Sequence, residues 1–376
     1  MSDTQKHTKP NVPNLRFPGF SDEWESRKIG EDCAVYMCKR IFANQTSDQG
    51  DVPFFKIGTI GGTPDAYISK DLFEEYRAKY NYPRKGEVMI TCAGTVGKTI
   101  VFDGEDAYFQ DSNIVWLSNP KQLYINPFLN YVLSRVNWNK LNSTTITRIY
   151  NDNLRELVIN FPTVKEQEKV VALLSILDKR IAIQNKVIEK YESLIKALRH
   201  NIFSTLVPEK EVTIADVLSY EQPTKYIVSD TEYSDNKDLT PVLTANKAFI
   251  LGYTEEAEGI YDKGPCIILD DFTLDSKIVD FPFKVKSSAI KILSARTTVR
   301  LRYIYEYLKF LDLNTGEHKR HYIAEIEPMM IELPEEDAIQ SISYLFDRMD
   351  HRRKGLEKDL QLLKSQKDYL LRALFI

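Results

Sequence analysis

Few residues in this sequence are spaced for catalysis or cofactor binding. The segment AGTVGKT (93–99) ends like a phosphate-binding loop, in which backbone amides and a lysine hold nucleotide phosphates. The full pattern requires a glycine five positions before Gly97, where this chain has Cys92. We therefore expect a glycine-bearing turn that displays Thr95 and Lys98.

Methyl transfer, metal binding and redox chemistry also lack their residues. The segment NPF (126–128) lacks the second proline of a DNA amino-methyltransferase motif. His318 and His321 lie three residues apart, but no cluster of Cys, Asp or Glu completes a metal site. Cys33 and Cys38 are too far apart for a redox pair and too isolated for zinc. No convincing active site remains.

Polar, basic and amide-bearing residues gather instead in loops at matched positions. The segment 143–153 sets Arg148, Tyr150 and Asn151 among threonines, and the matched segment 316–322 is basic. Arg and Lys suit guanine edges, Asn and Gln suit adenine edges, and either kind can hold phosphates. Each such residue is also ordinary in a solvated loop. Others of this kind are Thr95, Lys98, Gln110, Ser112, Asn113, Thr244, Asn246, Lys247, Lys319, Arg320 and His321.

The elements that position these loops occur twice. Residues 146–203 align with 318–375 at a constant shift of 172 without a gap, and 11 of the 58 pairs are identical. A period this long indicates a duplicated domain rather than a solenoid. Each copy begins with short β-rich runs broken by Gly, Pro, Asn and Asp, with short helical stretches between them. We therefore expect two α+β domains.

A long helix is expected at the end of each copy, after Pro162 and after Pro334. Thr163 and Glu166 have the spacing of a capping box. Apolar residues at heptad spacing predict an antiparallel coiled coil in which each helix is the partner of the other. The expected seam includes Leu174, Leu177, Ile181, Ile188 and Ile195 in the first helix, and Phe346, Met349, Leu356, Leu360 and Leu363 in the second.

The resulting organisation has five parts. They are an N-terminal segment (1–27), a first domain (28–160), a first long helix (161–207), a second domain (208–333) and a second long helix (334–376). The length of 376 residues is sufficient for two domains with their own cores.

Composition sets further limits. No apolar run approaches a membrane span, and four cysteines fit a reducing compartment, so we expect a cytoplasmic protein with no membrane partner. A net charge of −4 would by itself count against a nucleic-acid partner. Residues 163–203, however, carry eight Lys or Arg against five Asp or Glu.

The chain resembles type I restriction–modification specificity subunits. The opening NLRFPGFSDEWE (14–25), the segment FPTVKEQEKVVALLSILDKRI (161–181), the helix end KALRHNIF (196–203) and KGEVMITCAGTVGKT (85–99) carry the resemblance. The second copy departs from it, because TLDSK (273–277) replaces GTVGK and the terminal helix is more polar.

The resemblance implies two target-recognition domains in tandem, each reading one half of a bipartite, asymmetric site on double-stranded DNA. The two helices would set the spacer between the halves. Two methyltransferase subunits would dock on this chain, and restriction subunits would join them. S-adenosylmethionine, ATP and Mg2+ would belong to those partners, with no cofactor held by this chain and no catalysis of its own.

The expected DNA-binding residues are drawn from both copies. They are Lys56, Thr91, Thr95, Lys98, Gln110, Ser112, Asn113, Arg148, Tyr150, Asn151, Thr244, Asn246, Lys247, Thr273, Lys277, Lys319, Arg320 and His321.

Three other classes remain open on the sequence alone. The first is a stand-alone restriction or modification enzyme, for which Asp270 and Asp271 would be the acidic pair. The second is a coiled-coil scaffold that does not bind DNA. The third is a specificity subunit of a related system that is not type I.

Overall fold

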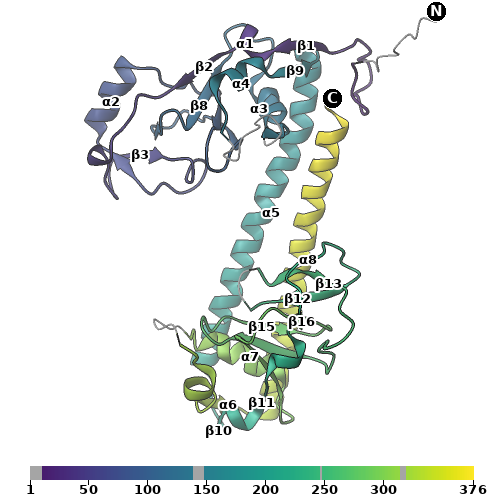
Figure 1. Cartoon of the computed structure of the whole chain (residues 1–376). Coiled ribbons are helices and arrows are strands. Elements are labelled where there is room, and N and C mark those ends of the chain that lie inside the picture. Colours follow the sequence, from purple (N-terminus) through teal and green to yellow (C-terminus); the bar gives the residue numbers. More distant parts are fainter. Residues whose placement is uncertain (1–10, 139–147, 246–247, 314–318) are drawn as a thin grey trace, which may run out of the picture. The chain divides into compact units, whose positions relative to one another are not determined.

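Two units make up the fold in the computed structural model, which describes residues 11–138, 148–245, 248–313 and 319–376. Unit 1 comprises residues up to 183 together with 360–376, and unit 2 comprises residues 184–359. Each unit holds one α+β domain and one part of each long helix (Figure 1). The predicted fold class, two α+β domains in tandem with two long helices, is confirmed.

The central sheet of domain 1, the globular part of unit 1, has four antiparallel strands in the order β2-β8-β5-β6. All four residues of the inner strand β5 are buried, as its apolar sequence VMIT predicts. A second sheet has the order β4-β3-β7, and β1 pairs with β9. The bounds are β1 Glu25–Lys28, β2 Ala34–Met37, β3 Val52–Phe55, β4 Tyr67–Ile68, β5 Val88–Thr91, β6 Thr99–Val101, β7 Tyr108–Phe109, β8 Ile114–Ser118 and β9 Val158–Phe161.

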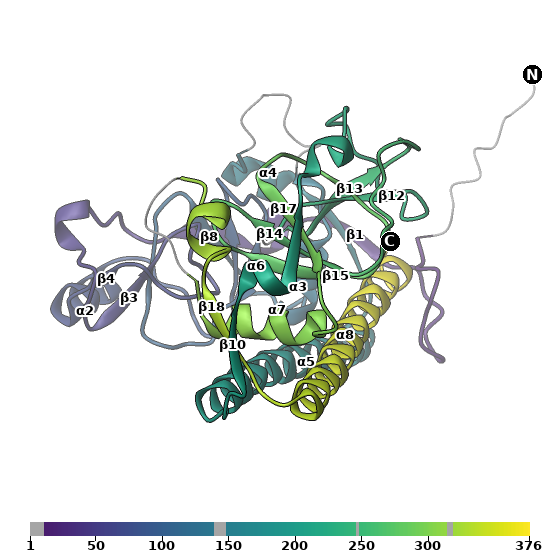
Figure 2. The same cartoon turned by 90° about the horizontal axis from the view of Figure 1, so that it is seen from below.

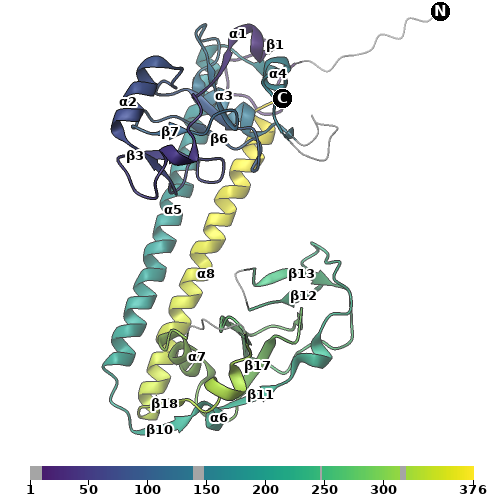
Figure 3. The ribbon, with the colours of Figure 1, turned by 60° about the vertical axis from the view of Figure 1, so that its left-hand side comes forward.

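Domain 2, the globular part of unit 2, repeats this topology strand for strand. Its sheets have the orders β11-β17-β14-β15 and β13-β12-β16, and β10 pairs with β18. Figure 3 separates β12 and β13 from β11 and β17. The bounds are β10 Lys210–Thr213, β11 Leu218–Glu221, β12 Thr240–Leu243, β13 Ile250–Thr254, β14 Cys266–Asp270, β15 Ser276–Val279, β16 Lys284–Val285, β17 Ile290–Ala295 and β18 Met330–Leu333. The internal repeat therefore extends from the sequence to the order of the strands.

The short helices show where the copies diverge. Those of domain 1 are α1 Ile29–Asp32, η1 Ala43–Gln45, α2 Lys70–Lys79, α3 Asn126–Ser134 and α4 Asn151–Glu156. Those of domain 2 are α6 Ile214–Val217, η3 Pro223–Tyr226, α7 Leu301–Phe310 and η4 Tyr322–Ile326, the last a π-helical turn. Helix α2 has no counterpart between β13 and β14. The Ser69 hydroxyl accepts from the Leu72 amide at 3.3 Å and caps the start of α2.

The long helices α5 (Val164–Ser204) and α8 (Glu336–Ala373) lie side by side and antiparallel within each unit (Figure 1). In unit 1, Lys367 Nζ lies 2.5 Å from Asp178 Oδ1. In unit 2, the Gln184 side-chain amide donates to the Leu356 carbonyl at 2.8 Å. Residues 184 and 356 are related by the 172-residue shift, so equivalent positions of the two helices meet at this contact.

The predicted seam faces inward. Leu174, Leu177, Phe346, Met349 and Leu356 are buried. Ile181, Ile188, Ile195, Leu360 and Leu363 are half-buried. Burial of these apolar side chains is the main force that holds the helices together.

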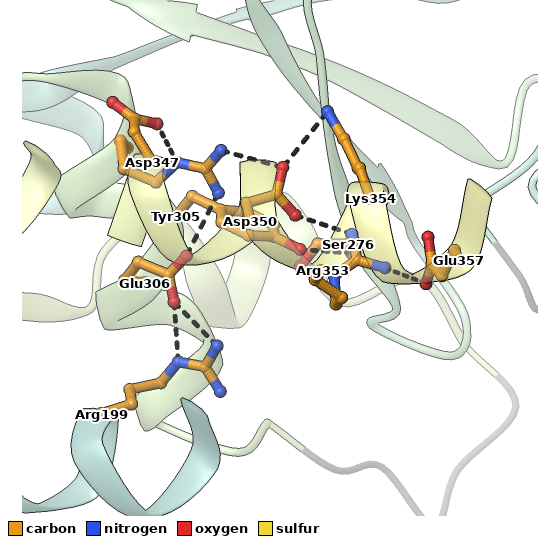
Figure 4. Close-up of polar contacts among 10 residues, drawn as sticks. Arg199, Ser276, Tyr305, Glu306, Asp347, Asp350, Arg353, Lys354 and Glu357 are labelled. Carbon is orange, nitrogen blue, oxygen red and sulfur yellow. Dashed lines mark hydrogen bonds and ion pairs between the residues drawn. The ribbon is translucent and has the colours of Figure 1, made fainter. Parts of the chain in front are cut away.

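Charged side chains tie α7 to both long helices of unit 2. Arg199 of α5 donates to Glu306 at 2.8 Å, and Arg302 donates to Asp347 of α8 at 2.7 Å. Figure 4 shows that the network extends to Asp350, which contacts Arg353 and Lys354. Figure 2 shows α7 beside α5 and α8. Burial acts to raise the pKa of Asp350, but Arg353 and Lys354 outweigh it and lower that pKa. The carboxylate therefore stays ionised within the network.

The expected capping box is replaced by an ion pair in unit 1. Two guanidinium nitrogens of Arg16, Nε and Nη2, each donate a hydrogen bond of 2.8 Å to the Glu166 carboxylate. Nearby, the Leu15 amide donates to the Ala373 carbonyl at 2.8 Å. The Glu166 carboxylate, in the first turn of α5, therefore binds the N-terminal segment through Arg16.

Candidate nucleic-acid interface

The turn after β5 is held rigidly in domain 1. The Thr91 hydroxyl accepts from the Lys98 amide at 3.0 Å and donates to the Thr95 carbonyl. Gly97 has a φ of +83°, and a Cβ there would overlap the Trp138 ring. The glycine of the AGTVGK turn is thus required for both its backbone conformation and its close approach to Trp138.

The segment between β7 and β8 lies beside that turn and holds the predicted arginine. The carbonyl and the hydroxyl of Ser112 accept from Arg148 at 3.2 and 3.3 Å. The Arg148 guanidinium lies 6.0 Å from the ring centroid of Tyr150, a residue that is 62% exposed. The Asn113 carbonyl accepts from the Cys92 amide at 2.7 Å. An arginine and an exposed aromatic ring are therefore presented at one end of the sheet.

Other predicted residues frame the same end of domain 1. Lys98 Nζ donates to the Ile60 carbonyl at 2.5 Å, which joins its turn to the segment after β3. The Gln110 side chain accepts from the Ile57 amide at 3.3 Å. Lys56 pairs with Asp65 at 3.1 Å. Asn151 is the first residue of α4, and Thr95 is exposed.

Domain 2 places an arginine in the matched position. Arg320 donates to the hydroxyl of Ser288 at 3.4 Å, as Arg148 does to Ser112. Ser112 and Ser288 precede the matched strands β8 and β17 by two residues. The neighbouring Lys319 pairs with Glu325 at 3.0 Å. Both copies therefore hold one arginine beside the start of the same strand.

Two predicted residues are directed into the protein instead. Thr91 is fully buried and its hydroxyl bonds the turn after β5. His321 is 2% exposed; its amide donates to Asp271 at 3.1 Å, and its Nδ1 lies 2.7 Å from Glu325. Both side chains are buried and bonded within their own domain, so DNA contact by Thr91 and His321 stays a prediction that this arrangement does not support.

Lys277 lies in strand β15 and lines a cavity. The cavity has a volume of about 650 Å³ and lies between domain 2 and the parts of α5 and α8 in unit 2. Lys309 also lines it. Burial lowers the pKa of Lys309, and the nearby charge of Lys277 lowers it further. Lys277 and Lys309 therefore line a cavity, whereas the predicted residues of domain 1 lie in loops at one end of the sheet.

Two further predicted residues of domain 2, Thr244 and Thr273, are loop residues. The Thr244 amide donates to the Phe249 carbonyl at 3.0 Å, and the Thr273 amide donates to Asp270 at 2.9 Å. Thr273 is exposed. Asn246 and Lys247 lie outside the described residues.

One exposed segment that the sequence analysis did not select adjoins the domain 1 residues. The Arg40 Nε atom lies 2.5 Å from Oδ2 of Asp111, the residue that precedes Ser112 in the chain. Its neighbours include Lys39 and Phe42, and Phe42 is 58% exposed. The sequence KRIFANQ (39–45), basic, aromatic and amide-bearing, carried a signal of the same kind as the selected loops.

The described residues contain neither a metal-binding cluster nor a cysteine with a lowered pKa. No group of three or more His, Cys, Asp or Glu side chains there is arranged to hold a metal ion. Burial raises the pKa of Cys33, Cys38 and Cys266 to about 12 and that of Cys92 to about 11. These thiols stay protonated at neutral pH. No helix among the described residues is long and apolar enough to cross a membrane.

Part of this chain is similar to known proteins. Residues 21–193 match the type I restriction modification DNA specificity domain. A putative type I restriction enzyme specificity subunit of Haemophilus influenzae is 49% identical over 43% of this chain and 41% of its own length. The specificity subunit of the Escherichia coli type I enzyme EcoR124I/EcoR124II is 41% identical over 42% of each chain. The match thus spans about two fifths of these relatives.

Solved structures share the fold over nearly the whole chain. A type I restriction–modification S subunit from M. genitalium superposes with a TM-score of 0.62, covering 97% of this chain and 99% of that one at 17% identity. A chain from a study of complex assembly in the type I system gives a TM-score of 0.51 at 14% identity, covering 96% and 98%. Residues 21–193 thus resemble a type I restriction modification DNA specificity domain, and the solved structures extend the likeness, in fold alone, to nearly the whole chain.

Proposed function

We propose that this chain supplies DNA sequence specificity to a type I restriction–modification complex. Domain 1 would read one half of a bipartite, asymmetric site on double-stranded DNA, and domain 2 would read the other. The match of residues 21–193 to a type I DNA specificity domain supports the recognition role. The strand-for-strand repeat supports two readers of similar design.

The observation that carries this proposal is the matched pair of arginines. Arg148 and Arg320 are related by the 172-residue shift, and each donates to a serine before the matched strand. A tethered guanidinium is pre-organised to hold a phosphate or to bond a guanine edge. Because the sequences around the two arginines differ, the two domains would read different bases.

The long helices would provide the scaffold. Their seam is buried or half-buried in each unit, and we propose that they act as a fixed spacer between the half-sites. Two methyltransferase subunits would dock on this chain, and restriction subunits would join them. S-adenosylmethionine, ATP and Mg2+ would bind to those subunits. This chain would act in the cytoplasm as a non-catalytic subunit.

Replacing each arginine tests the assignment of half-sites. With methyltransferase subunits present, Arg148→Ala and Arg320→Ala are each expected to weaken binding to the cognate duplex by about tenfold, since a specific arginine contact contributes about 1–3 kcal/mol. In the half-site read by domain 1, a change of the base that Arg148 contacts should affect the Arg148→Ala complex less than the wild type, and the same should hold for Arg320→Ala in the half-site read by domain 2. Fluorescence anisotropy with duplexes altered in one half at a time measures this.

Arg84→Ala is the matched control. Arg84 is exposed and precedes β5, at the opposite end of that strand from Thr91. This variant should retain wild-type affinity and discrimination. If both arginine variants bind all duplexes as the wild type does, the proposed reading role of the matched arginines is wrong.

A further inference from the structure

The turn that follows β2 exposes a large aromatic ring beside two cations. Phe42 is 58% exposed, and Arg40 is 61% exposed at its side chain. Lys39 is also exposed, and its ammonium lies 5.4 Å from the ring centroid of Tyr80. The charge on this turn therefore favours an anionic partner over an apolar one.

The exposed ring sits on an ordered turn. The Phe42 amide donates to the Gln45 side chain at 2.9 Å, and the Gln45 amide donates to the Phe42 carbonyl at 2.9 Å. The Thr46 hydroxyl donates to the Ala43 carbonyl at 2.9 Å. Because these bonds fix the backbone before any ligand arrives, contact through Phe42 would cost little conformational entropy.

Domain 2 shows that the fold does not require this exposure. The corresponding turn η3 also carries an aromatic residue, Tyr226, but that side chain is 4% exposed. Its ring packs edge-on against Tyr261 with centroids 5.2 Å apart, and its hydroxyl donates to Glu221 at 2.8 Å. The same element thus buries its aromatic ring in one copy and presents it to solvent in the other.

The turn is continuous with the domain 1 interface. Arg40 pairs with Asp111, and the adjacent Ser112 holds Arg148. Tyr150, beside Arg148, is a second exposed aromatic side chain. Basic groups interleaved with exposed rings form the pattern with which proteins bind phosphates and stack on bases.

We infer that Phe42 contacts DNA directly, wedging its ring against a base step of the half-site read by domain 1. Lys39 and Arg40 hold the flanking phosphates. This inference rests on the proposed function. It adds a residue that recognises DNA by stacking its ring on a base and separating a base step, rather than by hydrogen bonds. Apolar wedges of this kind partly unstack a base step and bend the duplex.

The test uses the full chain assembled with methyltransferase subunits. The probes are duplexes that carry the motif methylated by the wild-type complex, with 2-aminopurine placed in turn at each position of the half-site read by domain 1. The wild-type complex should raise the fluorescence at one step, where a base is unstacked. Phe42→Ala should abolish that rise and weaken binding about tenfold, within the range for loss of one stacked aromatic contact.

Two further variants separate the ring from the fold. Phe42→Trp keeps a planar apolar ring and should retain both the fluorescence rise and the affinity. Phe281→Ala removes a partly exposed ring from domain 2 and should leave the signal of the first half-site unchanged. Phe42→Ala and Phe42→Trp should each unfold at the wild-type urea concentration, because the Phe42 ring is 58% exposed.

Three outcomes would overturn the inference. If Phe42→Ala binds and unstacks like the wild type while Arg148→Ala loses discrimination, Phe42 is no wedge and the proposed function stands. If Phe42→Ala fails to assemble with methyltransferase subunits, the ring is a protein contact. If the wild-type complex shows no sequence preference, the proposed function fails together with the inference.

Discussion

A fragment of residues 1–210 is expected to pair with a second copy of itself and, with methyltransferase subunits, to methylate an inverted repeat of one half-site. The core of unit 1 includes Leu374 and Phe375, which follow the last residue of α8. The end of α5 carries Ile202 and Phe203 at the positions related to these by the 172-residue shift. A second fragment can therefore supply an apolar helix end of the same kind.

The aromatic contacts at the two helix ends are alike, which supports this replacement of one helix end by the other. Phe375 stacks on Phe128 of α3 with ring centroids 5.2 Å apart. Phe203 packs on Tyr303 of α7, the matched helix, at 5.5 Å. Sedimentation should show a fragment dimer, and sequencing of methylated bases should show a palindromic motif.

The control is the same fragment carrying Ile188→Asp. This change places a charge in the helix seam and should leave the fragment monomeric and inactive in methylation. A monomeric unmodified fragment, or a methylated sequence without two-fold symmetry, would contradict the account of two similar readers joined by matched helices.

Leu174→Asp is expected to produce the largest loss of stability. Leu174 is fully buried in a core that also contains Val170, Leu374 and Phe375. A carboxylate there loses the apolar contacts and is removed from solvent. The free energy of unfolding of unit 1 should fall by more than about 4 kcal/mol, as measured by urea denaturation.

Ile176→Asp provides the comparison within the same helix. Ile176 lies two residues away and is 55% exposed, so the same substitution there should cost less than about 1 kcal/mol. Equal losses for the two variants would mean that the assigned inner and outer faces of α5 are wrong.

Much of the architecture could be predicted from the sequence because it depends on repeated patterns. The heptad spacing predicted both long helices and their inner faces, and Leu174 and Phe346 are buried as expected. The apolar runs around Val88 and Cys266 became the inner strands β5 and β14. These features depend on periodic burial, which a sequence records directly.

Tertiary partners were harder to predict. The Glu166 side chain binds Arg16, a residue 150 positions away, which the local spacing of a capping box cannot reveal. Thr91 and His321 have side chains suited to DNA, but hydrogen bonds within their own domain bury them. The exposed Phe42 was missed because an aromatic residue in a sequence is ordinarily assigned to the core.

Sequencing methylated bases in cells with and without this gene, with the methyltransferase subunits present, tests the central claim most directly. The account predicts gene-dependent methylation at one bipartite, asymmetric motif with a spacer of constant length. Methylation that does not depend on the gene, or that falls on one contiguous motif, would contradict it.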